Sequence, residues 1–251
     1  MSIELTYYDD VAVIRLCRPE KLNAMTLQMY DALGDAFLSV RDDNNVRCVV
    51  LAGGEKAFCA GADLAEAVPA LAENRFDISH WDVAHLKNTA FYKPLICAIR
   101  GHCIGAGFEI MLATDIRIAS DKATFLLPEP VHGFVPAGGT LVRLVRQIGY
   151  VQAMEILLCS KTFGAQDMLS KGVINQVVPD DQVESVAIQL ARHIARFSPL
   201  AIQTIKEAVL TLQDEPIAEA FIKEAQLGQR TFTSPEAKAA LHAFANKSCH
   251  E

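Results

Sequence analysis

The sequence predicts an α/β core followed by a helical extension. Short apolar runs with the boundaries of buried strands alternate with helical patterns as far as Gln182. Beyond that point the strand patterns stop and only helical patterns remain. Strands that alternate with helices, followed by helices alone, are typical of an α/β domain with an appended helical region. We therefore expect a core over residues 1–195 and a helical region over residues 196–251.

The composition indicates a large buried core and few charged partners. The chain is 51% hydrophobic, and its net charge of −7 gives no reason to expect nucleic-acid binding. No apolar run approaches the ~20 residues of a membrane helix, and the amino terminus lacks the basic start and apolar stretch of a secretory signal. We expect no membrane partner.

The seven cysteines indicate a reducing compartment. They are odd in number, form no CxxC pair and mostly lie in apolar runs, as buried thiols of cytoplasmic proteins do. No set of histidines and cysteines has the spacing of zinc ligands, so we expect no metal. The protein is predicted to be cytoplasmic.

The individual elements follow from their hydrophobic periods. Six runs predict strands: residues 11–17, 46–52, 94–99, 115–119, 123–127 and 173–178, the last at a sheet edge. Helical periods cover residues 27–40, 140–148, 151–159, 165–169, 183–197, 199–212, 217–231 and 235–246. Thr26 is the expected N-cap of the first helix, and prolines at the start of the last three helices separate them.

Residues 65–92 have weak periodicity and contain Trp81, the single tryptophan. Such a stretch fits a lid over a pocket or a surface helix, and we favour the lid.

Three glycines lie where the predicted strand 94–99 leads into a helix: Gly101, Gly105 and Gly107. Glycine lets the backbone turn sharply and approach a ligand closely, although packing alone also explains glycine at such a junction. The free N–H groups at a helix start favour an oxygen that carries negative charge. Glu109 follows in the first turn and is a candidate acid or base. Ile110 stands where a dinucleotide-binding fingerprint needs glycine, so that cofactor is not favoured.

A second cluster of small residues, 56–64, also follows a predicted strand. Farther along, two prolines hold Glu129 in a stiff segment. Cys59 and Cys103 lie beside the two clusters and are conceivable nucleophiles, but buried packing explains them better.

Four segments together resemble the enoyl-CoA hydratase/isomerase (crotonase) family. They are residues 18–25, 58–64, 101–109 and 127–136, in the family's order over nearly the whole chain. The resemblance implies a crotonase-like fold of repeated ββα units, with C-terminal helices that build homotrimers, often paired as hexamers. It also implies acyl-CoA thioester substrates. Coenzyme A is then part of the substrate, and no separate cofactor is expected.

The resemblance further implies an oxyanion hole formed by the backbone N–H groups of Ala62 and Ala106. Chemistry next to a thioester carbonyl places negative charge on its oxygen, which fixed amide donors stabilise. By the same resemblance, Glu109 helps activate water and Glu129 exchanges the proton at C2. Isomerases of the family often keep only the second glutamate, so the pair favours hydration. Ala137 replaces a further acid of the dienoyl-CoA isomerases.

Other residues are implied by their places in the family motifs. The implied contacts to substrate and coenzyme A are Lys21, Lys56, Ala60, Asp63, Leu64, Gly105 and Lys247. The implied pocket-lining residues are Trp81, Phe108, His132, Pro136 and Ala137. Lys21 and Lys56 fit equally well as solvated surface lysines that contact no ligand. His132 fits better as an ordinary loop residue than as part of a pocket. The glycine pair at 138 and 139 lies one position earlier than in the family pattern.

The sequence therefore predicts a 2-enoyl-CoA hydratase or a close relative that runs the reverse dehydration. Three alternatives stay open. One is an enoyl-CoA isomerase that uses Glu129 alone, and another is a carnitinyl-CoA-type dehydratase. The third is an acyl-CoA-binding protein without catalysis.

Overall fold

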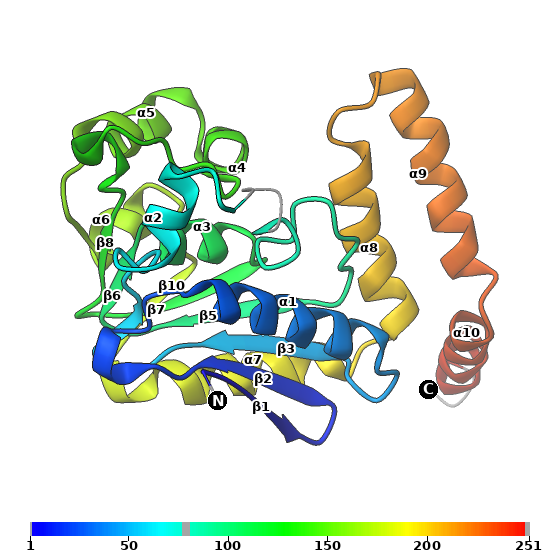
Figure 1. Ribbon diagram of the computed structural model, residues 1–251. Coiled ribbons are helices and arrows are strands. Elements are labelled where there is room, and N and C mark those ends of the chain that lie inside the picture. The colour runs from blue at the N-terminus through cyan, green and yellow to red at the C-terminus, as the bar shows by residue number, and fades with distance from the viewer. Residues whose placement is uncertain (1, 77–80, 249–251) are drawn as a thin grey trace.

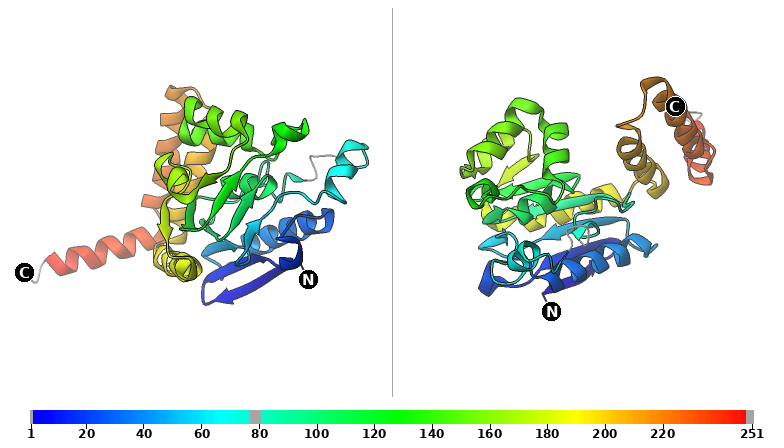
Figure 2. Two further views of the ribbon diagram at one scale, coloured as in Figure 1. Left: turned by 90° about the vertical axis from the view of Figure 1, so that its left-hand side faces the viewer. Right: turned by 45° about the horizontal axis from the view of Figure 1, so that its top comes forward.

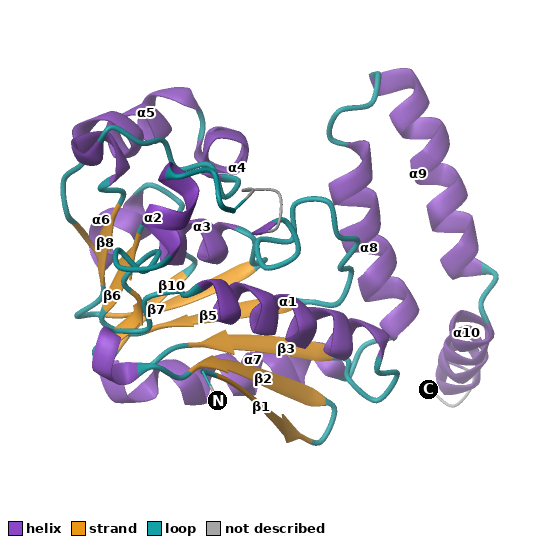
Figure 3. Ribbon diagram, in the orientation of Figure 1, coloured by secondary structure: helices purple, strands orange, loops and turns teal. Residues whose placement is uncertain are grey.

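A six-stranded sheet forms the base of the core (Figures 1 and 3). The computed structural model describes residues 2–76 and 81–248. The strand order is β1-β2-β3-β5-β7-β10, with β1 antiparallel to β2 and the other neighbours parallel. These strands are Ile3–Tyr8, Val11–Leu16, Cys48–Ala52, Leu95–Ile99, Ile116–Ser120 and Gln176–Val178.

One face of this sheet packs against α7 (Val183–Ala195). Alternate residues of the strands, among them Val13 and Val50, are fully buried against this helix. The helix presents small residues to them, including Ala187 and Ala191, which allows close approach. Strict alternation along each strand therefore divides the interior into two hydrophobic clusters.

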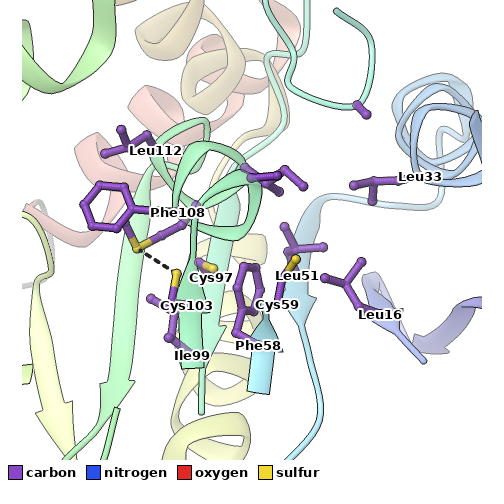
Figure 4. Close-up of a cluster of buried hydrophobic side chains, with 14 of the residues drawn as sticks. Leu16, Leu33, Leu51, Phe58, Cys59, Cys97, Ile99, Cys103, Phe108 and Leu112 are labelled. Atoms are coloured by element: carbon purple, nitrogen blue, oxygen red, sulfur yellow. Dashed lines mark hydrogen bonds between the residues drawn. The ribbon is translucent and has the colours of Figure 1, made fainter. Parts of the chain in front are cut away.

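The opposite face holds the larger cluster (Figure 4). It includes Leu16 and Leu51 from the sheet and Leu33 from α1 (Leu27–Asp42). The predicted N-cap is confirmed, because Oγ1 of Thr26 accepts a 3.2 Å hydrogen bond from the amide of Met29.

A second sheet of four short strands carries both glycine clusters. Its order is β4-β6-β8-β9, and only the β8–β9 pair is antiparallel. The strands are Ala57–Cys59, His102–Ile104, Thr124–Leu126 and Phe163–Gly164. The helix α3 (Ala106–Leu112) leaves directly from β6 through Gly105. The glycine clusters of the sequence are thus neighbours in space.

The predicted strands and helices of the core are present, with shifts of a few residues at their ends. The edge strand predicted over residues 173–178 is real but shorter, and the helix predicted over 183–197 ends at Ala195. The strand β1 and the short strands β4, β6 and β9 were not predicted. Between residues 65 and 92 one helix forms, α2 (Ala67–Ala72), and residues 77–80 lie outside the described residues.

The remaining helices complete the upper layer and the tail. The helices α4, α5 and α6 are Thr140–Ile148, Tyr150–Cys159 and Ala165–Ser170. The tail helices α8, α9 and α10 are Pro199–Leu212, Ile217–Phe232 and Pro235–Ser248. The pair α8 and α9 lies side by side, and α10 extends away from the core (Figure 2). Among the described helices, none is both long and apolar enough to cross a membrane.

Candidate active site

A cavity of about 380 Å³ lies where the two glycine clusters meet. Both candidate carboxyl groups, Glu109 and Glu129, line it. Ala62 and Ala106 line it as well, and most of the rest of its wall is apolar. The structure therefore brings together the four groups that the sequence singled out.

The amide groups of Ala62 and Ala106 come from adjacent backbone segments. A Cβ built on Gly61 would lie 3.9 Å from the amide nitrogen of Ala106. Ala106 is the first residue of α3, where amide groups have no partner within the helix. Within the described residues, neither amide hydrogen has a backbone acceptor. Both are therefore available to a ligand oxygen.

An ion pair fixes the segment that carries Ala62. The guanidinium of Arg18 donates a 2.6 Å hydrogen bond to Oδ2 of Asp63 and a 2.9 Å bond to the carbonyl of Ala24. Oδ1 of Asp63 accepts from the amides of Ala65 and Glu66. The Arg18 guanidinium beside it holds the pKa of Asp63 below its usual range. Asp63 thus anchors the loop.

Glu109 is almost wholly buried in α3, at 4% exposure. Its Oε1 accepts a 2.5 Å hydrogen bond from the amide of Gly138, and Oγ1 of Thr140 lies 3.4 Å away. Burial is the main cause that raises the pKa of Glu109 to about 7; the negative charge of Glu129 acts in the same direction, and the hydrogen bond from Gly138 acts against it. A carboxyl that titrates near neutral pH can both accept and release a proton.

Glu129 begins the short 3-10 helix Glu129–His132. Its Oε1 packs against the start of α3, where a Cβ built on Gly105 would approach it to 2.9 Å. Gly105 also has a φ of +50°, so glycine is required there on two grounds. Burial raises the pKa of Glu129, and its buried Oε2 has no protein partner among the described residues.

Several other predicted residues line the same cavity. They are Ala60, Leu64, Trp81, Gly105, His132 and Ala137. Trp81 is buried at 4% exposure, whereas His132 is exposed at the rim. The helix α2 also contributes to the wall through Val68, Leu71 and Ala72. Its role as a lid stays a prediction.

Asp63, Phe108 and Pro136 lie outside the lining of this cavity, so the substrate contact predicted for Asp63 and the pocket-lining roles predicted for Phe108 and Pro136 stay predictions. The oxygens of Asp63 are engaged by Arg18 and by its own loop, and the residue does not line the cavity. Phe108 belongs to the buried hydrophobic cluster (Figure 4). Its ring packs edge-on against that of Phe125, with 6.3 Å between the ring centroids. Pro136 is buried and contributes nothing to the cavity wall.

Two of the predicted lysines do not lie at this cavity. Lys21 and Lys56 are exposed and are not part of its lining. Lys247 lies in α10, outside the part of the chain whose side chains are described. A role for any of them in binding coenzyme A stays a prediction.

Three residues at the site were not predicted: His85, Gly138 and Thr140. Nε2 of the buried His85 lies 4.0 Å from Oε2 of Glu109. The shifted glycine pair was a signal for Gly138, because this shift brings its amide to Glu109. Nothing in the local pattern distinguished His85 from a surface histidine.

Comparison with known proteins identifies the family. Residues 6–250 match the model of the enoyl-CoA hydratase/isomerase family. The chain belongs to this family. It is 36% identical over 240 residues to the enoyl-CoA hydratase EchA19 of Mycobacterium tuberculosis, covering 94% of this chain and 90% of that protein.

Other family members are similar to a comparable degree. The carnitinyl-CoA dehydratase of Salmonella arizonae is 35% identical over 222 residues, covering 88% of this chain and 84% of that protein. The crystal structure of an enoyl-CoA hydratase from Bacillus anthracis superposes with a TM-score of 0.92 at 31% identity, covering 98% and 97% of the two chains. The crotonase-like fold predicted from the motifs is thereby confirmed.

Proposed function

We propose that this protein is an enoyl-CoA hydratase, which adds water reversibly across the C2–C3 double bond of a 2-enoyl-CoA thioester. The observation that carries this proposal is one cavity shared by the buried Glu109, the half-buried Glu129 and two amides that have no backbone acceptor among the described residues. The family and the hydratases among its relatives support the same reaction.

Each group has a distinct part in the proposed reaction. The amides of Ala62 and Ala106 donate to the thioester oxygen and stabilise the negative charge that develops there. Glu109, whose pKa is about 7, removes a proton from the attacking water. Glu129 delivers a proton to C2. Each acid–base step typically contributes ~10²–10⁴-fold.

Dehydration is the second candidate function. The 35% identity to carnitinyl-CoA dehydratase favours it, and the same two carboxyl groups serve elimination as well as addition. The apolar lining of the cavity suits a hydrocarbon acyl chain better than a charged one. We therefore rank a simple 2-enoyl-CoA above a carnitinyl-CoA as substrate.

We also propose that the tail helices assemble the protein into a homotrimer, or into a hexamer of two trimers. Large apolar side chains are exposed along them: Ile205, Val209, Leu210, Ile217, Phe221, Ile222 and Phe232. Exposed apolar surface of this kind is typical of an interface between subunits. A cytoplasmic location stays a prediction from cysteine usage.

The test is an assay with crotonyl-CoA at neutral pH. A hydratase consumes the absorbance of the conjugated thioester, and Glu129→Gln abolishes that change. Activity on a 3-enoyl-CoA alone would identify an isomerase instead. Binding of acyl-CoA esters without any conversion would identify a binding protein. Light scattering of the purified protein measures the number of subunits.

A further inference from the structure

His85 is fully buried, and its imidazole has a defined tautomer. Nδ1 lies 2.9 Å from the carbonyl oxygen of Trp81. A carbonyl oxygen can only accept, so Nδ1 carries the hydrogen and donates it. Burial lowers the pKa of His85 to about 4, so the ring is neutral near neutral pH. Nε2 is then left with an unshared lone pair.

This lone pair faces the carboxyl group of Glu109. Nε2 has no hydrogen-bond partner among the described residues and lies 4.0 Å from Oε2. The other oxygen, Oε1, is engaged by the amide of Gly138. Two acceptor atoms therefore face each other in a buried part of the protein, where unsatisfied polar atoms are costly. If Oε2 carried a hydrogen, it could donate a hydrogen bond to Nε2 of His85.

Aromatic packing holds the imidazole in this position. The ring of Tyr30 stacks on the rings of Trp81 and His85, with 4.4 Å and 5.7 Å between the ring centroids, respectively. Arg143 fixes the backbone of the same segment, donating 2.7 Å hydrogen bonds to the carbonyl oxygens of His85 and Leu86. The imidazole is therefore constrained through both its ring and its backbone.

Burial is the main reason that the imidazole is neutral, and the charged groups around the pair also act on it. Arg143 and Lys87 disfavour a second positive charge on it, while Asp82, which pairs with Lys87 at 2.8 Å, acts in the opposite sense. The negative charge of Glu129 favours the protonated form of Glu109, and the positive charge of Lys87 favours its ionised form. Tyr30 and Cys59 are buried beside this group and stay protonated at neutral pH, because burial raises their pKa values.

We propose that His85 is a positioning residue for Glu109, whose Nε2 accepts a hydrogen bond from Oε2 whenever Glu109 holds the proton taken from water. This inference rests on the proposed function. Rotation of the carboxyl group closes the gap once Oε2 is protonated. The bond stabilises the acid form of Glu109 and so makes the carboxylate a stronger base.

The proton balance of the addition is complete without a proton on His85. The O–H bond of water breaks, its oxygen bonds to C3, and its proton moves to Glu109. Glu129 gives its own proton to C2. The two carboxyl groups then return to their starting states by exchanging one proton through water.

Two substitutions of His85 distinguish the roles of its two ring nitrogens. In His85→Asn the side-chain amide takes the place of Nδ1, so the bond to Trp81 can persist while the acceptor facing Glu109 is lost. In His85→Gln the amide takes the place of Nε2 and retains an acceptor there. The exposed His193 of α7 supplies the control variant His193→Asn.

The first readout is an infrared titration of the substrate-free protein. The carboxyl band of Glu109 is identified by its loss in Glu109→Gln. We expect His85→Asn to lower the apparent pKa of this band by about one unit, which corresponds to a tenfold change in equilibrium. His85→Gln and His193→Asn should leave it near the wild-type value. An equal shift in the Asn and Gln variants, or none in either, would overturn the proposal.

The second readout is the pH profile of crotonyl-CoA hydration. His85→Asn should lower kcat about tenfold with little change in KM, by the same free-energy difference. Its acid limb should move to lower pH. Unchanged kcat in a variant whose carboxyl band has shifted would remove His85 from the reaction.

A third measurement uses the wild-type protein, so it does not depend on whether a variant folds. In wild-type protein with ¹⁵N-labelled histidine rings, the Nε2 resonance of His85 should move with the titration of Glu109 while the ring gains no proton. A fixed resonance would contradict the proposed bond. Neither spectroscopic readout depends on turnover. A missing hydratase activity with an intact titration shift would therefore reject the proposed function alone.

Discussion

The amide of Gly138 donates a 2.5 Å hydrogen bond to Oε1 of Glu109 across 29 positions of the chain. This bond joins the loop before α4 to the helix α3, which begins directly after Gly105. It also leaves Oε2 as the oxygen free to carry a proton. The orientation of the carboxyl group is thus set by the main chain of a distant segment.

Replacement of Gly138 by alanine should therefore damage the site. A Cβ at this position would lie 2.6 Å from Nε2 of His85 and 2.7 Å from Oε2 of Glu109, so one of these groups must move. Since a misplacement of about 1 Å can cost ~10² in rate, we expect kcat on crotonyl-CoA to fall about that far. Gly164→Ala is the control, because its nearest atom would lie at 3.7 Å. Equal rates in the two variants would contradict the tight packing.

Glu129→Gln should abolish turnover without unfolding the protein. The neutral amide cannot deliver a proton to C2, so we expect kcat to fall by ~10²–10⁴. Thermal unfolding should change little, because Oε2 of Glu129 has no protein partner among the described residues. Glu55→Gln, an exposed change outside the cavity lining, should retain wild-type kcat. Retained hydration in Glu129→Gln would reassign the reaction to Glu109 alone.

The stability of the protein should carry a pH signature of Glu109. Its pKa is about 7 in the folded state against an ordinary value of 4.5, so the folded chain keeps a proton that the unfolded chain releases. The free energy of unfolding therefore falls as pH rises from about 4.5 to about 7, by about 3 kcal/mol in total.

Glu109→Gln has no carboxyl group to ionise, so its free energy of unfolding should not fall in this way. Relative to wild type, the variant should therefore become more stable as pH rises from about 4.5 to about 7. Urea unfolding at pH 5 and pH 8, at one protein concentration, measures the difference. A stability difference that is the same at both pH values would show that Glu109 is ionised throughout.

Arg117 should be a major contributor to stability. Its buried guanidinium donates to four carbonyl oxygens, those of Met111, Leu112, Thr114 and Val173. Burial lowers its pKa to about 10, so it stays charged at neutral pH. Met111 and Leu112 keep other donors, from Thr114 and Gln147, but Arg117→Met removes the side-chain donor from the oxygens of Thr114 and Val173. We expect it to cost about 4 kcal/mol in denaturant unfolding. Arg41→Met, at an exposed pair on α1, should have no measurable effect.

The sequence predicted the fold where patterns were long and the site where residue types were unusual. Apolar runs such as residues 46–52 specify buried strands by themselves, and Thr26 identifies a helix start. The strand β6, three residues between glycines, is too short for its period to be read. Its pairing with β4 and β8 depends on contacts that are distant in sequence.

The contacts of the site were harder to predict than its members. Glu109 and Glu129 stand out because carboxyl groups are rare in apolar surroundings. His85 does not stand out, because its role depends on the stacking with Tyr30 and on a segment without periodicity. Asp63 and Phe108 sit in motif positions, but an ion pair and core packing direct their side chains elsewhere.

Two neutral donors at the cavity belong to the backbone, at Ala62 and Ala106. A backbone N–H survives every side-chain replacement except proline. Substitutions can therefore reshape the apolar wall of the cavity while the amide donors proposed to bind the thioester oxygen stay in place.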